Sequence, residues 1–156
     1  MKLALVGISH HRAPVELRER VAVDLDGAAA LARSLADGCE AVVLSTCNRT
    51  ELYLAATEAR DLDARGTAAL LELAAERGDE VAPVLYRLGD ESAALHLFRV
   101  AAGLDSMVPG EGEILGQVRT AYEAGAPGPL LDRLFRQALH AGRRARLETA
   151  IGESPA

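Results

Sequence analysis

Four short segments have the hydrophobic pattern of β-strands. Residues 2–9 are apolar on both faces, so this strand is expected inside a sheet. Residues 41–44 form an unbroken apolar run, and residues 50–56 alternate, with leucines on one face and a glutamate and a tyrosine on the other. A fourth strand is predicted over residues 83–88, beginning at Pro83 or lying at an edge of the sheet.

Helical periodicity separates these strands. Helices are predicted over residues 15–21, 26–37 and 61–77, and Gly38 and Gly78 are expected to end the second and the third. The resulting order is β-α-β-β-α-β. This order predicts an α+β fold of the ferredoxin-like type, an antiparallel sheet with helices on one face.

The rest of the chain is predicted to add helices to that fold. Asp90 is a candidate N-cap for a helix over residues 91–102, and two further helices are expected over residues 114–124 and 130–150. The first of them has an apolar stripe at helical spacing, which should face the core: Ala94, Leu97, Phe98, Ala101 and Ala102.

Composition excludes several classes of protein. With 49% hydrophobic and 26% charged residues, the chain has the balance of a folded globular protein and not of a disordered one. No apolar run approaches a membrane span, and no signal peptide is recognisable. Two cysteines predict reduced thiols in the cytoplasm, with neither a disulfide scaffold nor a metal site. A net charge of −6 excludes a generally basic nucleic-acid binder.

Cys47 is the first candidate for chemistry. It lies in a tight polar connection, residues 45–49, between two predicted strands. The thiolate is the reactive form of cysteine, and a cation such as Arg49 lowers the pKa of a nearby thiol. The alternative is a small residue that fills a turn.

His96 is the second candidate. It lies away from the predicted apolar stripe of its helix, which is typical of a surface histidine. Beside a cleft, however, it would serve as a general acid or base, or would orient a substrate.

A glycine-rich loop over residues 103–113 is the third candidate. Its glycines do not have the G-x-G-x-x-G spacing, and a helix precedes them, so a dinucleotide site is not predicted here. Small residues, Ser106 and the carboxylates of Glu111 and Glu113 could instead hold the amino and carboxyl groups of a small polar ligand.

The last predicted helix is rich in arginine. It has no acidic residue between Arg133 and Leu147. A solvated helix face and a local contact with a phosphate backbone are both compatible with this pattern.

Several separated motifs together resemble the glutamyl-tRNA reductase family. They cover nearly the whole chain in the family's order: GISH (residues 7–10), STCNRTE (residues 45–51), HLFRVAAGLDSM (residues 96–107), Gly110 with Glu111, and ILGQV (residues 114–118).

The resemblance implies a reaction and its site residues. The family reduces glutamyl-tRNA to glutamate-1-semialdehyde with NADPH, the first committed step of the five-carbon route to tetrapyrroles. Its nucleophile falls on Cys47 and its histidine needed for activity on His96. Its substrate-recognition positions fall on Thr46, Asn48, Arg49, Ser106, Glu111 and Gln117.

Two adjacent positions depart from the family pattern. Gly112 and Glu113 stand where members usually have an acidic or small residue and then glutamine. We include both in the predicted substrate site. A carboxylate lacks the N–H donors of an amide, so the side chain of Glu113 is expected to accept hydrogen bonds only.

The resemblance also predicts the domain organisation. Residues 1–150 would be the catalytic domain, and residues 151–156 would begin a linker to an NADPH-binding domain that this chain does not contain. No cofactor site is therefore expected in this chain. Family membership implies glutamyl-tRNA as substrate, a homodimer formed through a further C-terminal domain, and the semialdehyde aminomutase as a possible partner.

Two other functions remain open from the residues alone. A free-standing thiol-dependent esterase would use Cys47 and His96 and let water take the acyl group. A binding module that senses charged tRNA would not depend on Cys47 at all.

Overall fold

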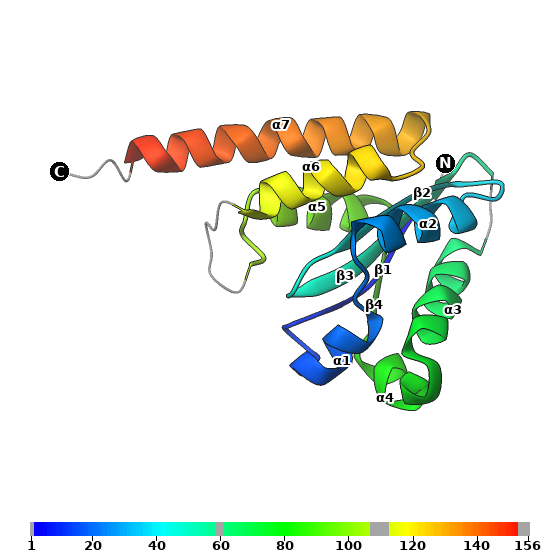
Figure 1. Ribbon diagram of the computed structural model, residues 1–156. Coiled ribbons are helices and arrows are strands. Elements are labelled where there is room, and N and C mark those ends of the chain that lie inside the picture. The colour runs from blue at the N-terminus through cyan, green and yellow to red at the C-terminus, as the bar shows by residue number, and fades with distance from the viewer. Residues whose placement is uncertain (1, 59–60, 107–112, 153–156) are drawn as a thin grey trace.

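The computed structural model describes residues 2–58, 61–106 and 113–152. Its centre is a four-stranded antiparallel sheet in the order β2-β3-β1-β4 (Figure 1). This is the order of a ferredoxin-like sheet, and it confirms the predicted fold class. The strands are β1 (Lys2–Ser9), β2 (Glu40–Ser45), β3 (Arg49–Ala56) and β4 (Tyr86–Gly89).

Helices fill the connections and the last third of the chain. The first group is α1 (Val15–Val21), α2 (Leu25–Leu35), α3 (Leu62–Ala74) and the single turn α4 (Gly78–Val81), with short 3₁₀ turns at Ala75–Arg77 and Ala82–Val84. The second group is α5 (Asp90–Ala101), α6 (Glu113–Ala124) and α7 (Pro129–Gly152). Within the described residues, no helix is both long and apolar enough to cross a membrane.

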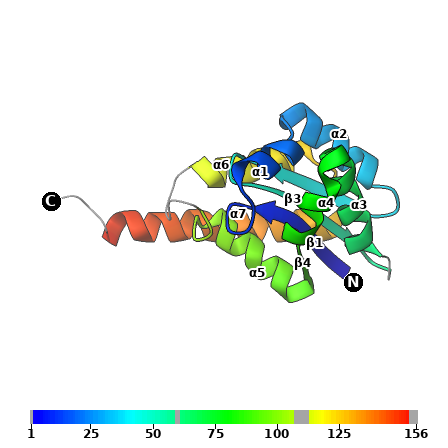
Figure 2. The ribbon, with the colours of Figure 1, turned by 90° about the horizontal axis from the view of Figure 1, so that it is seen from below.

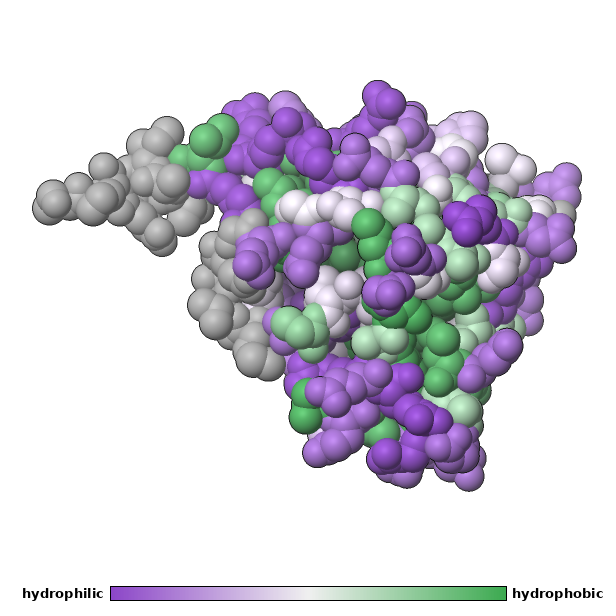
Figure 3. Space-filling model, viewed as in Figure 1, coloured by the Kyte–Doolittle hydropathy of each residue, from purple (hydrophilic) through white to green (hydrophobic). Residues whose placement is uncertain are grey.

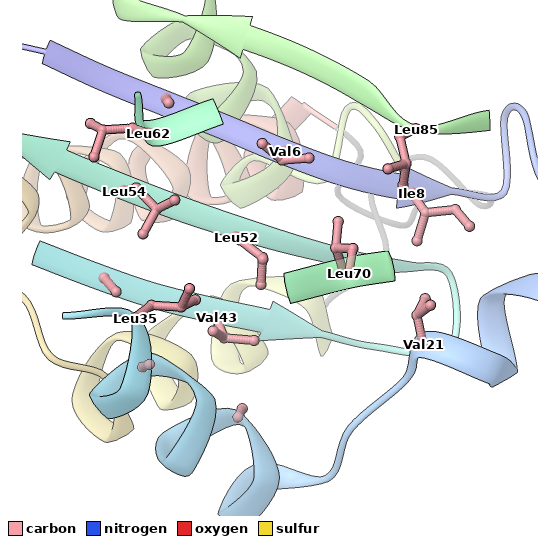
Figure 4. Packing of buried hydrophobic residues seen from close by; sticks show 14 of the residues in the cluster. Val6, Ile8, Val21, Leu35, Val43, Leu52, Leu54, Leu62, Leu70 and Leu85 are labelled. Carbon is pink, nitrogen blue, oxygen red and sulfur yellow. The ribbon is translucent and has the colours of Figure 1, made fainter. Parts of the chain in front are cut away.

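The sheet is buried on both faces. Alternate residues of β1 and β3, such as Val6 and Leu54, point into one hydrophobic core with residues of α1, α2 and α3 (Figure 4). The opposite residues, such as Leu5 and Tyr53, pack against α5, α6 and α7. In Figure 1 the strands lie between α5, α6 and α7 above and α1, α3 and α4 below, and Figure 2 looks onto the sheet from the side of α1, α3 and α4. The expectation of helices on one face holds for the first group, and the C-terminal helices cover the second face.

The sequence misplaced two boundaries in the middle of the chain. The helix predicted over residues 61–77 breaks at Ala75, whose φ of 52° is left-handed, and Gly78 starts α4 instead of ending a helix. The fourth strand begins at Tyr86, because Pro83 lies in a 3₁₀ turn. The alternative of an edge strand is confirmed for β4.

The first residue of α5 and the face that it buries also differ from the prediction. Asp90 has a φ of 49°, and its carboxylate accepts a hydrogen bond from the Leu3 N–H (3.1 Å) instead of capping the helix. The residues of α5 that are buried are Ala93, Leu97, Val100 and Ala101. The buried stripe is therefore rotated from the predicted one, and this rotation changes the environment of His96. At the other end of the chain, α7 continues to Gly152, and residues 153–156 of the expected linker lie outside the described residues.

Candidate functional site

Cys47 lies at the tip of the β2–β3 hairpin. The Thr46 N–H donates to the Arg49 carbonyl (2.7 Å), so Cys47 and Asn48 form a two-residue turn. The Asn48 N–H donates to the Thr46 hydroxyl (3.1 Å), which fixes the turn from within. The Cys47 side chain is exposed. The turn therefore presents the thiol to solvent at the end of the sheet.

Two contacts from the N-terminal part of the chain hold this turn in place. The His10 N–H donates to the Asn48 carbonyl (2.9 Å), and Arg18 on α1 donates through Nη1 to the Cys47 carbonyl (3.3 Å). Arg18 thus brings a positive charge to the backbone of the hairpin turn that contains Cys47, a contact that the sequence alone did not indicate.

Arg49, the first residue of β3, is 1% exposed. Its Nη1 donates to Oδ2 of Asp105 (2.9 Å) and to Oε2 of Glu51 (3.3 Å), and its Nη2 donates to the Asp105 carbonyl. Two carboxylates therefore neutralise the cation that was expected to act on Cys47. Any ligand that binds this guanidinium must replace one of its present acceptors.

Glu51 is the centre of a buried polar cluster. It is completely buried, and its carboxylate also accepts hydrogen bonds from Tyr53 (2.8 Å), Tyr86 (2.5 Å) and His96 (2.5 Å). Burial by itself raises the pKa of a carboxyl group. Here the hydrogen bond and charge of His96, followed by Arg49 and Tyr86, hold the pKa of Glu51 at about 2. The carboxylate is consequently charged at neutral pH.

His96 faces the sheet and not the solvent. Its side chain is 16% exposed, and Nε2 lies 2.5 Å from Oε2 of Glu51. The interpretation of His96 as a surface residue was wrong, because the buried stripe of α5 is rotated toward it. The tyrosine ring of Tyr86 packs beside the imidazole, with centroids 5.7 Å apart.

The segment after α5 brings Asp105 and Ser106 to the same end of the sheet. Asp105 is bonded to Arg49, and its other carboxylate oxygen lies 3.4 Å from Nε2 of His11. Ser106 is half-buried next to it. The predicted site residues Glu111 and Gly112 lie outside the described residues.

Glu113 and Gln117 occupy a cleft at the free edge of β2. Both are exposed residues of α6, and the cleft of about 570 Å³ between α6 and α2 is also lined by Ser45, which precedes Thr46. The structure therefore joins Arg49 to Asp105 directly and to His96 through the carboxylate of Glu51. It places Glu113 and Gln117 in the edge cleft that ends near the hairpin.

Four arginines of α7 are exposed, namely Arg133, Arg136, Arg143 and Arg144, and Arg146 is half-buried. Hydrophilic residues gather along the upper edge of the molecule in Figure 3, where α7 runs in Figure 1. Arg136 pairs with Asp132 and Arg144 with Glu148, each one turn away on the same helix. These pairs are typical of a solvated helix face, which is the simpler of the two interpretations. Arg119, Arg136 and Arg143 also line a groove of about 320 Å³ between α6 and α7.

The described residues do not form a recognisable cofactor site. They contain no cluster of three or more His, Cys, Asp or Glu side chains placed to hold a metal ion. A nicotinamide dinucleotide needs a glycine turn between a strand and a helix. Gly116 does not fit this role, because it lies inside α6.

Sequence reasoning missed Glu51, Tyr86 and Asp105 as members of the site. Glu51 and Asp105 lie within the quoted motifs, and a glutamate in the middle of an otherwise apolar strand is a signal of a buried polar contact. Tyr86 carried no such signal, since its role depends on the neighbouring strand.

The fold and the hairpin define a class: an α+β domain that exposes one cysteine beside a buried Arg–Glu–His cluster. Sequence comparison gives this class a family. The family model described as "Glutamyl-tRNAGlu reductase, N-terminal domain" matches residues 6–149. The chain belongs to this family, which confirms the resemblance seen in its motifs.

Individual relatives agree with this assignment. The chain is 51% identical to a glutamyl-tRNA reductase of Rubrobacter xylanophilus, over 99% of this chain and 37% of the relative. It is 44% identical to that of Synechocystis, over 97% and 37%. Among solved structures, glutamyl-tRNA reductase from Methanopyrus kandleri matches with a TM-score of 0.69 and 33% identity, over 98% of this chain and 36% of that one. The chain thus spans little more than a third of these relatives.

Proposed function

We propose that this chain accepts the glutamyl group in the glutamyl-tRNA reductase reaction, with Cys47 as the nucleophile. One observation carries the proposal: the exposed cysteine of the family's STCNRTE motif lies at a hairpin tip fixed by Thr46, Asn48 and Arg18. A nucleophile on a rigid turn can meet a substrate that is far larger than the domain itself.

In the proposed acyl transfer one bond forms for each bond that breaks. The Cys47 thiolate attacks the ester carbonyl that joins glutamate to the tRNA, a C–S bond forms, and the ester C–O bond breaks. The departing tRNA oxygen takes a proton and the tRNA leaves. A thioester carbonyl has less resonance stabilisation than an ester, so the glutamyl-enzyme is activated toward hydride or water.

His96 is the proposed group for orientation or proton transfer in this step. The hydrogen bond of Nε2 to Glu51 leaves Nδ1 as the nitrogen not bonded to that carboxylate. An imidazole with one nitrogen fixed and one available is suited to hold a substrate or to pass a proton.

Arg49 is the proposed partner for the side-chain carboxylate of glutamate. The guanidinium fork binds both oxygens of a carboxylate, and here it already holds the carboxylate and the carbonyl of Asp105. We propose that the substrate carboxylate takes the position of the Asp105 carboxylate. Thr46, Asn48, Ser106 and Gln117, with Glu111, Gly112 and Glu113, complete the proposed substrate site.

The reductive step is assigned to a part of the protein outside these 156 residues. NADPH supplies a hydride to the thioester in the complete reaction, and glutamate-1-semialdehyde is released for tetrapyrrole synthesis. For the complete protein we propose a separate NADPH-binding domain, a cytoplasmic homodimer, and transfer of the product to the aminomutase. The size of the chain relative to its relatives supports this division.

A thiol-dependent esterase is the second candidate function for this chain by itself. The observation in its favour is the exposure of Cys47, which leaves a thioester open to water. The two candidates share the acyl-enzyme and differ only in what removes the glutamyl group.

The test is transfer of labelled glutamate from glutamyl-tRNA to protein. The wild-type chain should retain label after denaturation, Cys47→Ser should retain none, and the matched Cys39→Ser variant should behave as wild type. Cys39 is a fair control because it is half-buried and its thiol contacts the Leu35 carbonyl at the end of α2. Label on Cys47→Ser would refute the nucleophile, and unchanged tRNA binding without transfer in wild type would favour a binding module.

A further inference from the structure

A row of three residues crosses the sheet beneath His96. Gly7 on β1 pairs with Glu51 on β3 and with Tyr86 on β4, so all three lie side by side on the same face. The Tyr86 side chain extends over β1, and its hydroxyl donates to Oε2 of Glu51 (2.5 Å).

The contact between Tyr86 and Glu51 is possible because Gly7 has no side chain. A Cβ atom at Gly7 would lie 2.8 Å from Cζ of Tyr86 and 2.9 Å from Cγ of Glu51. These distances are shorter than any real contact between carbon atoms, so a side chain at this position must displace the tyrosine, the glutamate or both. The requirement for glycine comes from close packing, since the backbone here is ordinary strand.

Tyr86 and His96 bind the same oxygen of Glu51. Oε2 of Glu51 accepts from Tyr86 and from Nε2 of His96, while Oε1 accepts from Tyr53. An ionised carboxylate only accepts hydrogen bonds, so the shared contact requires a proton on Nε2 of His96. Such an arrangement fixes both the tautomer and the orientation of an imidazole.

We propose that Glu51 and Tyr86 are positioning residues for His96, and that Gly7 leaves the space that the Tyr86 side chain needs to reach Glu51. This inference rests on the proposed role of His96 in glutamyl transfer. Neither residue needs to touch the substrate, because Tyr86 acts through the imidazole and Glu51 acts through the imidazole and through its contact with Arg49.

The kinetic test is a double-mutant cycle on the single-turnover rate of glutamyl transfer to Cys47. Tyr86→Phe and Glu51→Gln should each slow transfer, by about 10-fold and about 100-fold respectively, since loss of a residue that orients a functional histidine commonly costs 10- to 100-fold. In a His96→Ala background Tyr86→Phe should cause no further loss, and the loss from Glu51→Gln should shrink to the part that acts through its contact with Arg49. A residue with a merely structural role would slow transfer equally in both backgrounds, and that result would overturn the proposal.

Matched controls distinguish the roles of the Tyr86 hydroxyl and of Gly7 from general destabilisation of the fold. Tyr122→Phe removes a tyrosine hydroxyl that binds Asp132, away from this cluster, and should leave the rate unchanged. Gly7→Ala should reproduce the loss of Tyr86→Phe, while Gly89→Ala, whose Cβ would meet only the Leu3 carbonyl at 3.7 Å, should not. Equal rates for the two alanine variants would contradict the role of Gly7.

A spectroscopic test of the His96 ring depends neither on enzyme activity nor on the stability of the Glu51 variant. Nitrogen chemical shifts of the His96 ring should show a protonated Nε2 in wild type. In Glu51→Gln, or in Tyr86→Phe if the former does not fold, a mixture of tautomers or a mobile ring is expected. An Nε2 without a proton in wild type would overturn the proposal even if transfer to Cys47 is intact. Absence of transfer with the expected spectrum would leave the proposal standing and refute the proposed function.

Discussion

Arg49 and Glu51 are two charged side chains buried completely on one face of β3. Removing ions from water is costly, and such groups persist in a protein interior only when their bonding capacity is well satisfied. Glu51 has four donors, and Arg49 has three acceptors. At the scale of the residue, the site is therefore a buried charge network with one exposed thiol beside it.

Arg49 and Asp105 should respond in opposite directions if the substrate carboxylate replaces that of Asp105. Arg49→Lys should weaken transfer from glutamyl-tRNA strongly, because an ammonium group cannot form the two-pronged contact. Asp105→Asn should lower the glutamyl-tRNA concentration for half-maximal transfer by about fivefold, equivalent to ~1 kcal/mol from a weakened internal competitor. Single-turnover titrations measure both.

Glutaminyl-tRNA is the control substrate, because its side chain carries no carboxylate. Both variants should change its transfer much less than that of glutamyl-tRNA. Equal effects on the two substrates would show that Arg49 acts on the fold or the thiol and not on the glutamate side chain.

Glu51 predicts an acid-labile contribution to stability. Its pKa is about 2 in the folded protein against an ordinary value of 4.5, so the stabilisation is fully present above pH 4.5 and is lost as the pH falls toward 2. The free energy of unfolding should drop by about 3 kcal/mol more in wild type than in Glu51→Gln over this range. Denaturant titrations of both proteins at pH 5 and pH 2 test this, and parallel losses would contradict it.

The polar cluster around Glu51 could be predicted only in part from the sequence. The sequence placed Glu51 and Tyr53 on the face of β3 opposite its leucines, and this alternation is correct. It could not show that helices from the end of the chain cover that face. Cys47 was located correctly in a tight connection, because the apolar run before it and the alternation after it are local patterns.

At the scale of the elements, α5 carries the main error and its explanation. Its sequence offers two apolar stripes of similar quality, one with Ala94 and Phe98 and one with Ala93 and Val100. Periodicity cannot choose between them, since both fit a helix. Contacts with β1 and with α7 decide, and they turn His96 toward Glu51. The ferredoxin-like class, by contrast, was predicted from the order of elements, and the observed strand order agrees with it.

The crossing of α5 and α7 depends on a glycine. A Cβ at Gly142 would lie 2.8 Å from the Ala101 carbonyl oxygen, a backbone atom that cannot move aside easily. Gly142→Ala should therefore destabilise the protein by about 1–3 kcal/mol. Gly116→Ala, in the open on α6, should stabilise it by about 0.5–1 kcal/mol, the usual gain for a helix interior.

Thermal or denaturant unfolding of the two alanine variants gives the comparison directly. Both changes add one methyl group to a helix, so helix propensity cancels between them. Stabilisation by both would mean that α5 and α7 do not approach as closely as the structure shows.

At the scale of the whole molecule, our proposal assigns reduction to another part of the protein and acyl transfer to this chain. Its described residues contain no glycine turn between a strand and a helix that would hold a dinucleotide. Positioning of a reactant contributes several kcal/mol to a reaction barrier, so free NADPH should not replace a bound one. Water needs no binding site.

This division predicts the products. With glutamyl-tRNA and excess NADPH, the 156-residue chain should release glutamate slowly and form no glutamate-1-semialdehyde. Separation of the products by chromatography, with Cys47→Ser as the blank, measures both. Semialdehyde from this chain would place a cofactor site within it and overturn the proposed domain boundary.

The central claim is that Cys47 carries the glutamyl group, and the most direct measurement is the site of the covalent bond. The chain is mixed with labelled glutamyl-tRNA, quenched in acid, digested and mapped by mass spectrometry. The account predicts one labelled peptide, containing Cys47, whose label is released by hydroxylamine as expected for a thioester. Label on Cys39 or on any other residue, or a bond that resists hydroxylamine, would contradict it.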